Sequence, residues 1–424
     1  MKIITEGLPE ATDYFGVIRT MSGVKDCIIV EHGAPGTMTY TQLSFHSMNR
    51  ETIHGNIFSS GVDENDVVMG SDTRLADAVQ WVDSKYNPAM IAVVATAITA
   101  VIGLDIDGFC RKMQTGISAR LVPFASGGFR GTYFSGIEDA CRALIDTFVK
   151  SREIPTEERS VNIIGPTGEA FNTASDLTEI RRILNLMGVS VNTVFPHECR
   201  SSDIAAIPSA KLNLVTRDLM VPVGEHIRKA CGQGFFYGAP IGIRGTVEWI
   251  QKVSALLGIE YPDQMVTEEI ARYAFALPEV FSRIQTYDHF TTVIACPYEY
   301  AHGLSRLVTE DWGLTVSAVV LPEQPQASDF HDSFAKLGVK EILVNPSDRI
   351  FTEMIQSTRP QVLFGNTYHL KLGKSVPIRI HAAPPTPDIL TLFDGTPFTG
   401  FRGYAHLTQR LVNEAGAHKE EFTP

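Results

Sequence analysis

Hydrophobic positions along the chain recur with two alternating spacings. Short continuous apolar runs are typical of buried strands, and each is followed by a stretch whose apolar residues lie three or four apart, as on one face of a helix. The runs that predict strands are 27–30, 66–69, 91–96, 120–123, 161–164, 190–195, 212–216, 291–295, 314–321, 341–344 and 361–364. Regular alternation of strand and helix predicts an α/β fold built on mainly parallel sheets that helices cover on both faces.

The helical spacing continues to the C-terminus. It predicts helices over 75–85, 137–149, 175–187, 242–258, 267–277, 299–310 and 403–414. Ser175 is a suitable N-cap for the third of these, and Gly188 is a suitable residue to end it.

Three successive cycles of strands and helices divide the chain. Its 424 residues are too many for one core, since domains usually hold roughly 100–200 residues. A charged, proline-containing stretch at 150–158 separates the first cycle from the second, and a third begins near Phe290. We therefore expect domains at 1–155, 156–287 and 288–424.

Composition narrows the class of protein. The net charge of −12 argues against nucleic acid and anionic membranes as partners. The six cysteines show no C-x-x-C spacing, which excludes a self-contained zinc or iron–sulfur motif, and the first ten residues do not resemble a signal peptide. The apolar stretch 88–104 contains β-branched residues and closes with turn residues, so we interpret it as a buried strand and not a membrane span. These features predict a cytoplasmic protein with reduced thiols.

The segment 31–37, EHGAPGT, follows the first apolar run and opens into a predicted helix. Strand ends of this kind are where open α/β sheets usually bind ligands, although an ordinary turn has the same composition. His32 is a candidate for ligand binding or proton transfer, and the alternative is a histidine whose hydrogen bonds are satisfied within the turn.

Other motifs are weaker. The glycine-rich segments 126–131 and 165–168 match neither a dinucleotide-binding fingerprint nor a phosphate loop, so we predict no bound NAD or ATP. Residues 197–199 are His-Glu-Cys, but adjacent residues rarely converge on one metal ion. Cys296 is interpreted as a small buried hydrophobe. Since no nucleophile motif or carboxylate pair stands out, the catalytic residues are unknown.

Several motifs together resemble the nitrogenase component 1 family. Segment 23–40, GVKDCIIVEHGAPGTMTY, resembles the family's N-terminal motif, and segments resembling later family motifs follow in the expected order at 66–75, 92–107, 240–250 and 400–403. The resemblance implies three Rossmann-like domains, each a mainly parallel sheet flanked by helices, around a shallow central cleft.

The cysteines that hold an iron–sulfur cluster in this family are missing here. Their positions fall on Thr37, on Ala97 and near Ala11, and neither a hydroxyl nor a methyl group replaces a thiolate. The B-type subunit of dark-operative protochlorophyllide reductase has an aspartate where Thr37 lies. Cys27 lies upstream in the strand and is no simple substitute. The cysteine and histidine that hold the large cofactor in α-type subunits are also not found.

The resemblance implies that His32, Gly36, Thr37 and Ala97 face the cofactor, and that a cluster requires ligands from a partner subunit. It predicts a β-like subunit of a nitrogenase-like oxidoreductase, which pairs with a homologous subunit and receives electrons from an ATP-dependent iron-protein reductase, in a hetero- or homo-oligomer. One alternative is a non-catalytic scaffold or binding protein for a metallocofactor or tetrapyrrole that has lost its own cluster. Another is a resemblance limited to the fold, with a role in solute binding or group transfer.

Overall fold

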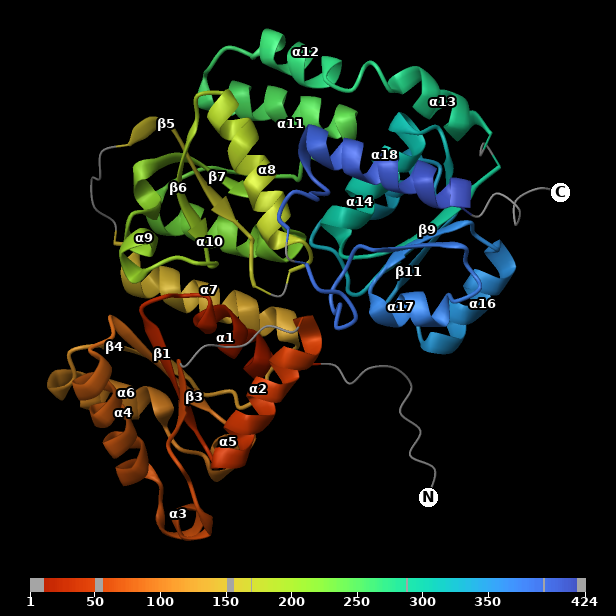
Figure 1. Cartoon of the computed structure of the whole chain (residues 1–424). Coiled ribbons are helices and arrows are strands. Elements are labelled where there is room, and N and C mark those ends of the chain that lie inside the picture. Colours follow the sequence, from red (N-terminus) through yellow and green to blue (C-terminus); the bar gives the residue numbers. More distant parts are fainter. Residues whose placement is uncertain are drawn as a thin grey trace.

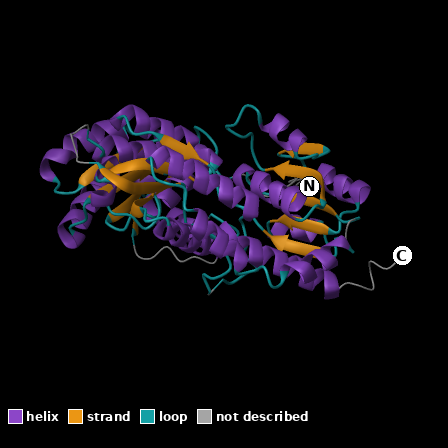
Figure 2. Ribbon diagram, turned by 90° about the horizontal axis from the view of Figure 1, so that it is seen from above, coloured by secondary structure: helices purple, strands orange, loops and turns teal. Residues whose placement is uncertain are grey.

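The computed structural model describes residues 11–49, 56–150, 156–168, 170–286, 289–391 and 393–417. Three separate parallel sheets follow one another along the chain. Helices cover the sheets, as Figure 1 and Figure 2 show, so the predicted α/β class is confirmed.

The first sheet has the strand order β2-β1-β3-β4. Its strands are β1 (Cys27–His32), β2 (Ile57–Ser59), β3 (Met90–Ala95) and β4 (Arg120–Phe124). Its helices are α1 (Asp13–Ser22), α2 (Pro35–Asn49), α3 (Glu64–Met69), α4 (Asp72–Tyr86), α5 (Ala97–Ile102), α6 (Ile106–Met113) and α7 (Tyr133–Phe148), with a 3₁₀ turn at Gln114–Gly116. Alternate residues of β1 belong to different cores, since Ile29 packs in the cluster that includes α1 and α7 and Val30 packs in the cluster that includes α4 and α6.

The second sheet has the order β6-β5-β7-β8. Its strands are β5 (Glu157–Ile164), β6 (Ser190–Phe195), β7 (Ala210–Val215) and β8 (Phe235–Tyr237). Its helices are α8 (Thr173–Leu186), α9 (Ser201–Ala205), α10 (Val221–Cys231), α11 (Gly242–Leu257) and α12 (Asp263–Ala271), with 3₁₀ turns at Ile207–Ser209 and Asp218–Met220. Ile164 and Val215 share a continuous hydrophobic cluster with Ile29 of the first sheet, so the two sheets are joined through a common core.

Four amide side chains form a ladder across the second sheet. Asn192 donates to Asn162 at 2.7 Å, Asn162 donates to Asn213 at 2.9 Å, and Asn213 donates to Gln233 at 2.8 Å. Gln233 in turn donates to the Ala210 carbonyl. Because Asn162 and Asn213 are fully buried, each amide depends on its neighbours for the hydrogen bonds that water would otherwise supply.

The third sheet has the order β11-β10-β9-β12-β13. Its strands are β9 (Thr291–Ala295), β10 (Thr315–Leu321), β11 (Glu341–Val344), β12 (Val362–Gly365) and β13 (Ile378–His381). Its helices are α13 (Leu277–Gln285), α14 (Tyr298–Arg306), α15 (Phe330–Lys336), α16 (Asp348–Thr358), α17 (Thr367–Leu372) and α18 (Gly400–Ala417); α14 continues into a π-helical turn at Leu307–Asp311.

The C-terminal segment ties the third sheet to the second. Helix α18 packs against α8 and α11 (Figure 1), and the chain that enters it is held by Asp176 at the start of α8. The buried Asp176 carboxylate accepts hydrogen bonds from the backbone N–H groups of Phe398 at 2.7 Å and Thr399 at 3.1 Å, and from the Tyr300 hydroxyl.

The strand order reverses direction at one point in each sheet. This point lies between β1 and β3 in the first sheet, between β5 and β7 in the second, and between β9 and β12 in the third. The loops that leave the carboxyl ends of two such strands diverge, which leaves a crevice suited to a ligand.

Three predictions from the sequence are wrong in detail. Residues 66–69 form part of helix α3 and not a strand, because Asp63 accepts hydrogen bonds from the backbone N–H groups of Asn65 and Asp66 and caps a helix. Helix α8 begins after Asn172, so Ser175 is a buried residue inside the helix and not its N-cap. The helix predicted over 267–277 is instead two helices, since α12 ends at Ala271 and α13 begins at Leu277.

Two further predictions concern boundaries and membranes. The boundary at 155 falls at residues outside the described part of the chain, and the domain limits remain predictions. None of the helices in the described ranges has the length and apolar character needed to cross a membrane.

Candidate functional site

The turn after β1 lies against the turn after β3, at the reversal point of the first sheet. A Cβ atom on Gly33 would lie 2.4 Å from the Oγ1 atom of Thr96, so only glycine fits there. The Thr96 and Thr99 hydroxyls donate to the His32 carbonyl at 2.9 and 2.7 Å. These contacts hold the first residues of α2 and α5 at the same edge of the sheet, which is the edge that the sequence predicts as a ligand site.

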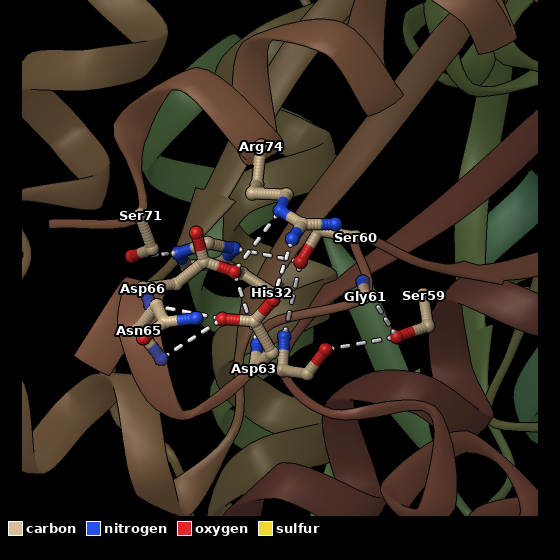
Figure 3. Close-up of polar contacts among 10 residues, drawn as sticks. His32, Ser59, Ser60, Gly61, Asp63, Asn65, Asp66, Ser71 and Arg74 are labelled. Atoms are coloured by element: carbon tan, nitrogen blue, oxygen red, sulfur yellow. Dashed lines mark hydrogen bonds and ion pairs between the residues drawn. The ribbon is translucent and has the colours of Figure 1, made fainter. Parts of the chain in front are cut away.

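His32 holds the turn in place through its side chain. Its Nδ1 and Nε2 atoms lie 2.8 Å from the hydroxyls of Ser60 and Ser71, respectively, as Figure 3 shows. The ring is fully buried, and burial lowers its pKa to about 4. A neutral imidazole with both nitrogens engaged matches the satisfied turn histidine considered above and offers no ring nitrogen to a ligand.

A set of charged side chains supports this turn from the outside. Arg74 donates to Asp63 at 2.6 Å and pairs with Asp66 at 3.0 Å (Figure 3). Because Asp63 also caps α3, these contacts fix a short helix whose Val68 and Met69 side chains are 80% and 85% exposed.

The other three predicted site residues lie at the surface of the same edge. Gly36 is exposed and Thr37 is half-buried in the first turn of α2, while Ala97 is exposed at the first residue of α5. The Thr37 carbonyl accepts a hydrogen bond from the Thr41 hydroxyl at 3.0 Å, which is an ordinary contact within a helix. The structure thus brings Thr37 and Ala97 to adjacent strand ends, as the predicted alignment requires. Ala11 lies elsewhere and lines a separate cavity.

The donor groups at this edge do not fit an iron–sulfur cluster held by this chain. Segments 33–37 and 96–102 contain no cysteine. Cys27 begins β1, at the opposite end of that strand, and burial raises the pKa of its thiol well above the ordinary value. Since iron–sulfur clusters are normally held by thiolates, we derive no chemical step through a cluster bound by this chain alone.

The structure also contains a buried acid that the sequence did not reveal. The Glu31 carboxyl is fully buried and neither oxygen has a hydrogen-bond partner among the described residues. Burial raises its pKa, and the Tyr14 and Thr41 hydroxyls, which lie 3.1 Å apart, partly oppose that effect. A carboxyl in this environment retains its proton to a higher pH than an exposed one.

Two other candidates from the sequence lie away from this edge. In the His-Glu-Cys segment, the Glu198 side chain is mostly exposed, while the Cys199 thiol is buried and donates to the Pro196 carbonyl at 3.4 Å. These side chains therefore do not converge. Cys296 is buried at the end of β9, as predicted, and burial raises the pKa of its thiol well above the ordinary value.

A cavity of about 520 Å³ lies where the three sheets meet. The loops that follow all five strands of the third sheet contribute to it, together with Arg217 after β7 and the start of α7. Cys296 and Asn366 mark the reversal point of the third sheet, and Arg217 lies at that of the second. Sequence reasoning missed this cavity because its lining residues are far apart along the chain.

The three sheets and their facing strand ends define a nitrogenase-like α/β protein. The fold matches a solved structure, "Nitrogenase Cp1 at pH 6.5", with a TM-score of 0.80 and 18% identity over 100% of this chain and 96% of the other. The family described as "Nitrogenase component 1 type Oxidoreductase" matches residues 12–415. The chain belongs to that family.

Curated relatives with similar sequences share one name, the B-type subunit of light-independent protochlorophyllide reductase. The chain is 24% identical over 410 residues to the relative from Chloroflexus aurantiacus, covering 93% of this chain and 74% of the relative. It is 30% identical over 258 residues to the relative from Prosthecochloris aestuarii, covering 58% and 46%, and 22% identical over 415 residues to that from Rippkaea orientalis, covering 94% and 81%.

Proposed function

We propose that this chain is a subunit of a nitrogenase-like oxidoreductase complex, which pairs with a homologous subunit and receives electrons from an ATP-dependent iron–sulfur reductase. Family membership supports the oxidoreductase class, and the names of the relatives, as subunits of a reductase, support an assembly of several chains.

The observation that carries the pairing is an apolar surface around Thr37 and Ala97. We call it the pairing face, and it consists of exposed residues that follow the four strand ends of the first sheet: Tyr40, Leu43, Val67, Val68, Met69, Ile98, Val101, Ile102 and Phe129. Figure 1 shows α3 and α5 toward one end of this sheet. Exposed apolar groups concentrated at one edge are typical of an interaction surface, because a single exposed apolar residue is common but a cluster costs solubility.

The partner would supply the cluster ligands. Thr37 and Ala97 offer neither thiolate nor carboxylate, so a cluster at this edge depends on the opposing subunit for its bonds to iron. This chain would then contribute shape and exclude water through the pairing face, while the cofactor carries the chemistry.

A second candidate is a binding or scaffold protein for a metallocofactor or tetrapyrrole that no longer holds a cluster. The large cavity and the absence of thiolates from the predicted cluster positions favour it. Tight uptake of a metallocofactor in anaerobic spectra without turnover would support this role, whereas steady substrate reduction by the complex would exclude it.

Co-expression tests the proposed function. The chain should co-purify anaerobically with the homologous subunit encoded beside its gene, and the complex should contain iron that a low-potential donor reduces. A complex without iron that does not respond to such a donor would contradict the redox role. Failure to form any complex would contradict the pairing.

A further inference from the structure

The central cavity combines mainly apolar walls with a few polar groups at one end. Tyr133, Phe134, Pro297 and Pro384 are among the residues that supply flat apolar surface. The volume of about 520 Å³ lies within the range typical of small-molecule sites, which are mostly apolar with a few polar groups that orient the ligand.

The polar end is formed where the loop after β10 meets the loop after β7. Glu323 and Arg217 both line the cavity there. The Arg217 guanidinium is buried, and its Nε atom lies 3.6 Å from Oε1 of the buried Glu299. This pair is electrically balanced, so the charge at this end is determined mainly by the protonation of Glu323.

Several neighbours influence Glu323. Burial raises its pKa to about 8, the charges of Glu299 on α14 and Asp218 raise it further, and Arg217 opposes the shift. Asp218 does not line the cavity; one oxygen accepts from the Gln326 backbone at 2.7 Å and its own pKa is raised by burial. The Glu323 carboxyl therefore holds a proton at neutral pH and acts as a hydrogen-bond donor.

The remaining titratable groups in the wall are uncharged. Burial lowers the pKa of His369 to about 4 and keeps the Cys296 thiol protonated. A protonated thiol and a neutral imidazole beside a guanidinium are poor ligands for a metal cluster. Amides from Gln324, Asn345 and Asn366 complete the polar lining.

We propose that this cavity binds a flat, largely apolar organic molecule that carries a carboxylate, with the carboxylate placed between Arg217 and Glu323. The apolar walls would cover the body of the molecule, and the guanidinium and the carboxylic acid would bind its anionic end. The inference rests on the proposed function only in assigning a role to this ligand, as the molecule that the complex reduces or carries. The cavity lies in the chain itself and away from the pairing face.

Fluorescence titration of the full chain with 1-pyrenebutyrate, compared with the cation 1-pyrenebutylamine, tests the proposal. The carboxylate should bind more tightly at pH 7, and its affinity should fall about tenfold between pH 7 and pH 9 as Glu323 ionises. In Glu323→Gln, which retains a donor but does not titrate, this pH dependence should disappear. Preference for the cation, or an affinity for the carboxylate that rises with pH, would overturn the proposal.

Two further variants locate the bound probe. Val344→Trp places a large side chain in the cavity wall and should abolish binding, whereas Val101→Asp on the pairing face should leave binding unchanged. The reverse pattern would overturn the proposal, as would no binding of either probe to a folded wild-type chain. Because the isolated chain is used, these results do not depend on whether the chain pairs with a partner.

Discussion

Gly33 and Thr96 lie so close together that the turn after β1 accepts no side chain. A Cβ on Gly33 would be 2.4 Å from the Thr96 hydroxyl oxygen, and that hydroxyl cannot move away without losing its hydrogen bond to the His32 carbonyl. This contact joins the two strand ends that carry Thr37 and Ala97. The candidate site therefore depends on packing between two turns that are about sixty residues apart in the sequence.

Gly33→Ala should destabilise the chain by about 1–3 kcal/mol, the usual cost of an overpacked methyl group. Chemical denaturation would measure the free energy of unfolding. Gly36→Ala is the matched control, because open space surrounds a Cβ at that position and alanine favours a helix over glycine by up to about 1 kcal/mol. Equal effects of the two substitutions would contradict the packing described here.

Charged residues on the pairing face should prevent assembly without affecting the fold. We expect Met69→Asp and Val101→Asp each to reduce the amount of co-purified homologous subunit at least about tenfold, since each would bury a charge in an apolar interface. The thermal midpoint of the isolated chain should change little because both side chains are exposed. Phe275→Asp, at an 88% exposed phenylalanine beyond the end of α12, is the control and should pair normally. Loss of pairing in the control alone would place the interface elsewhere.

Restoring two thiols should restore iron binding. Thr37→Cys combined with Ala97→Cys should raise the iron content of the assembled complex, because the two positions lie at adjacent strand ends and thiolates are the missing ligands. Thr39→Cys with Ala97→Cys is the control, since Thr39 is exposed two residues farther along α2. Unchanged iron in an intact double-variant complex would contradict the alignment of Thr37 and Ala97 with the cluster positions.

Asp176 should make stability depend on pH. Burial raises its pKa from the ordinary value of 3.8 to about 6, so the folded state holds this proton more tightly than the unfolded state. The stability that the bound proton provides is complete below pH 4 and is lost as the pH rises through about 6. Asp176→Asn does not titrate, so its unfolding free energy relative to wild type should increase by about 3 kcal/mol between pH 4 and pH 7. A constant difference over this range would show that Asp176 ionises normally.

The sequence predicted the regular elements better than the places where they meet. The first strand and its turn were predictable because β1 is an uninterrupted apolar run and 33–36 contains two glycines and a proline. Helix α3 was not, because the run at 66–69 has the composition of a strand, and the deciding feature is the cap that Asp63 provides. Strands β2 and β8 were missed because three residues are too few to show a period.

The candidate site divides in the same way. The sequence placed Thr37 and Ala97 at strand ends, and the structure sets those ends side by side. The role of His32 as support for the turn depends on Ser60 and Ser71, which no local pattern connects to it. The central cavity escaped prediction for a similar reason, because Arg217 and Glu323 become neighbours only when the second and third sheets pack together.

The amide ladder across the second sheet limits how this protein can change over evolutionary time. Asn192, Asn162, Asn213 and Gln233 each satisfy the next, so an apolar substitution at one of them leaves a buried partner unsatisfied, at a cost of about 1–3 kcal/mol. Descendants of this sequence are expected to keep all four amides or to replace them together, whereas the exposed positions of α12 and α13 can vary independently.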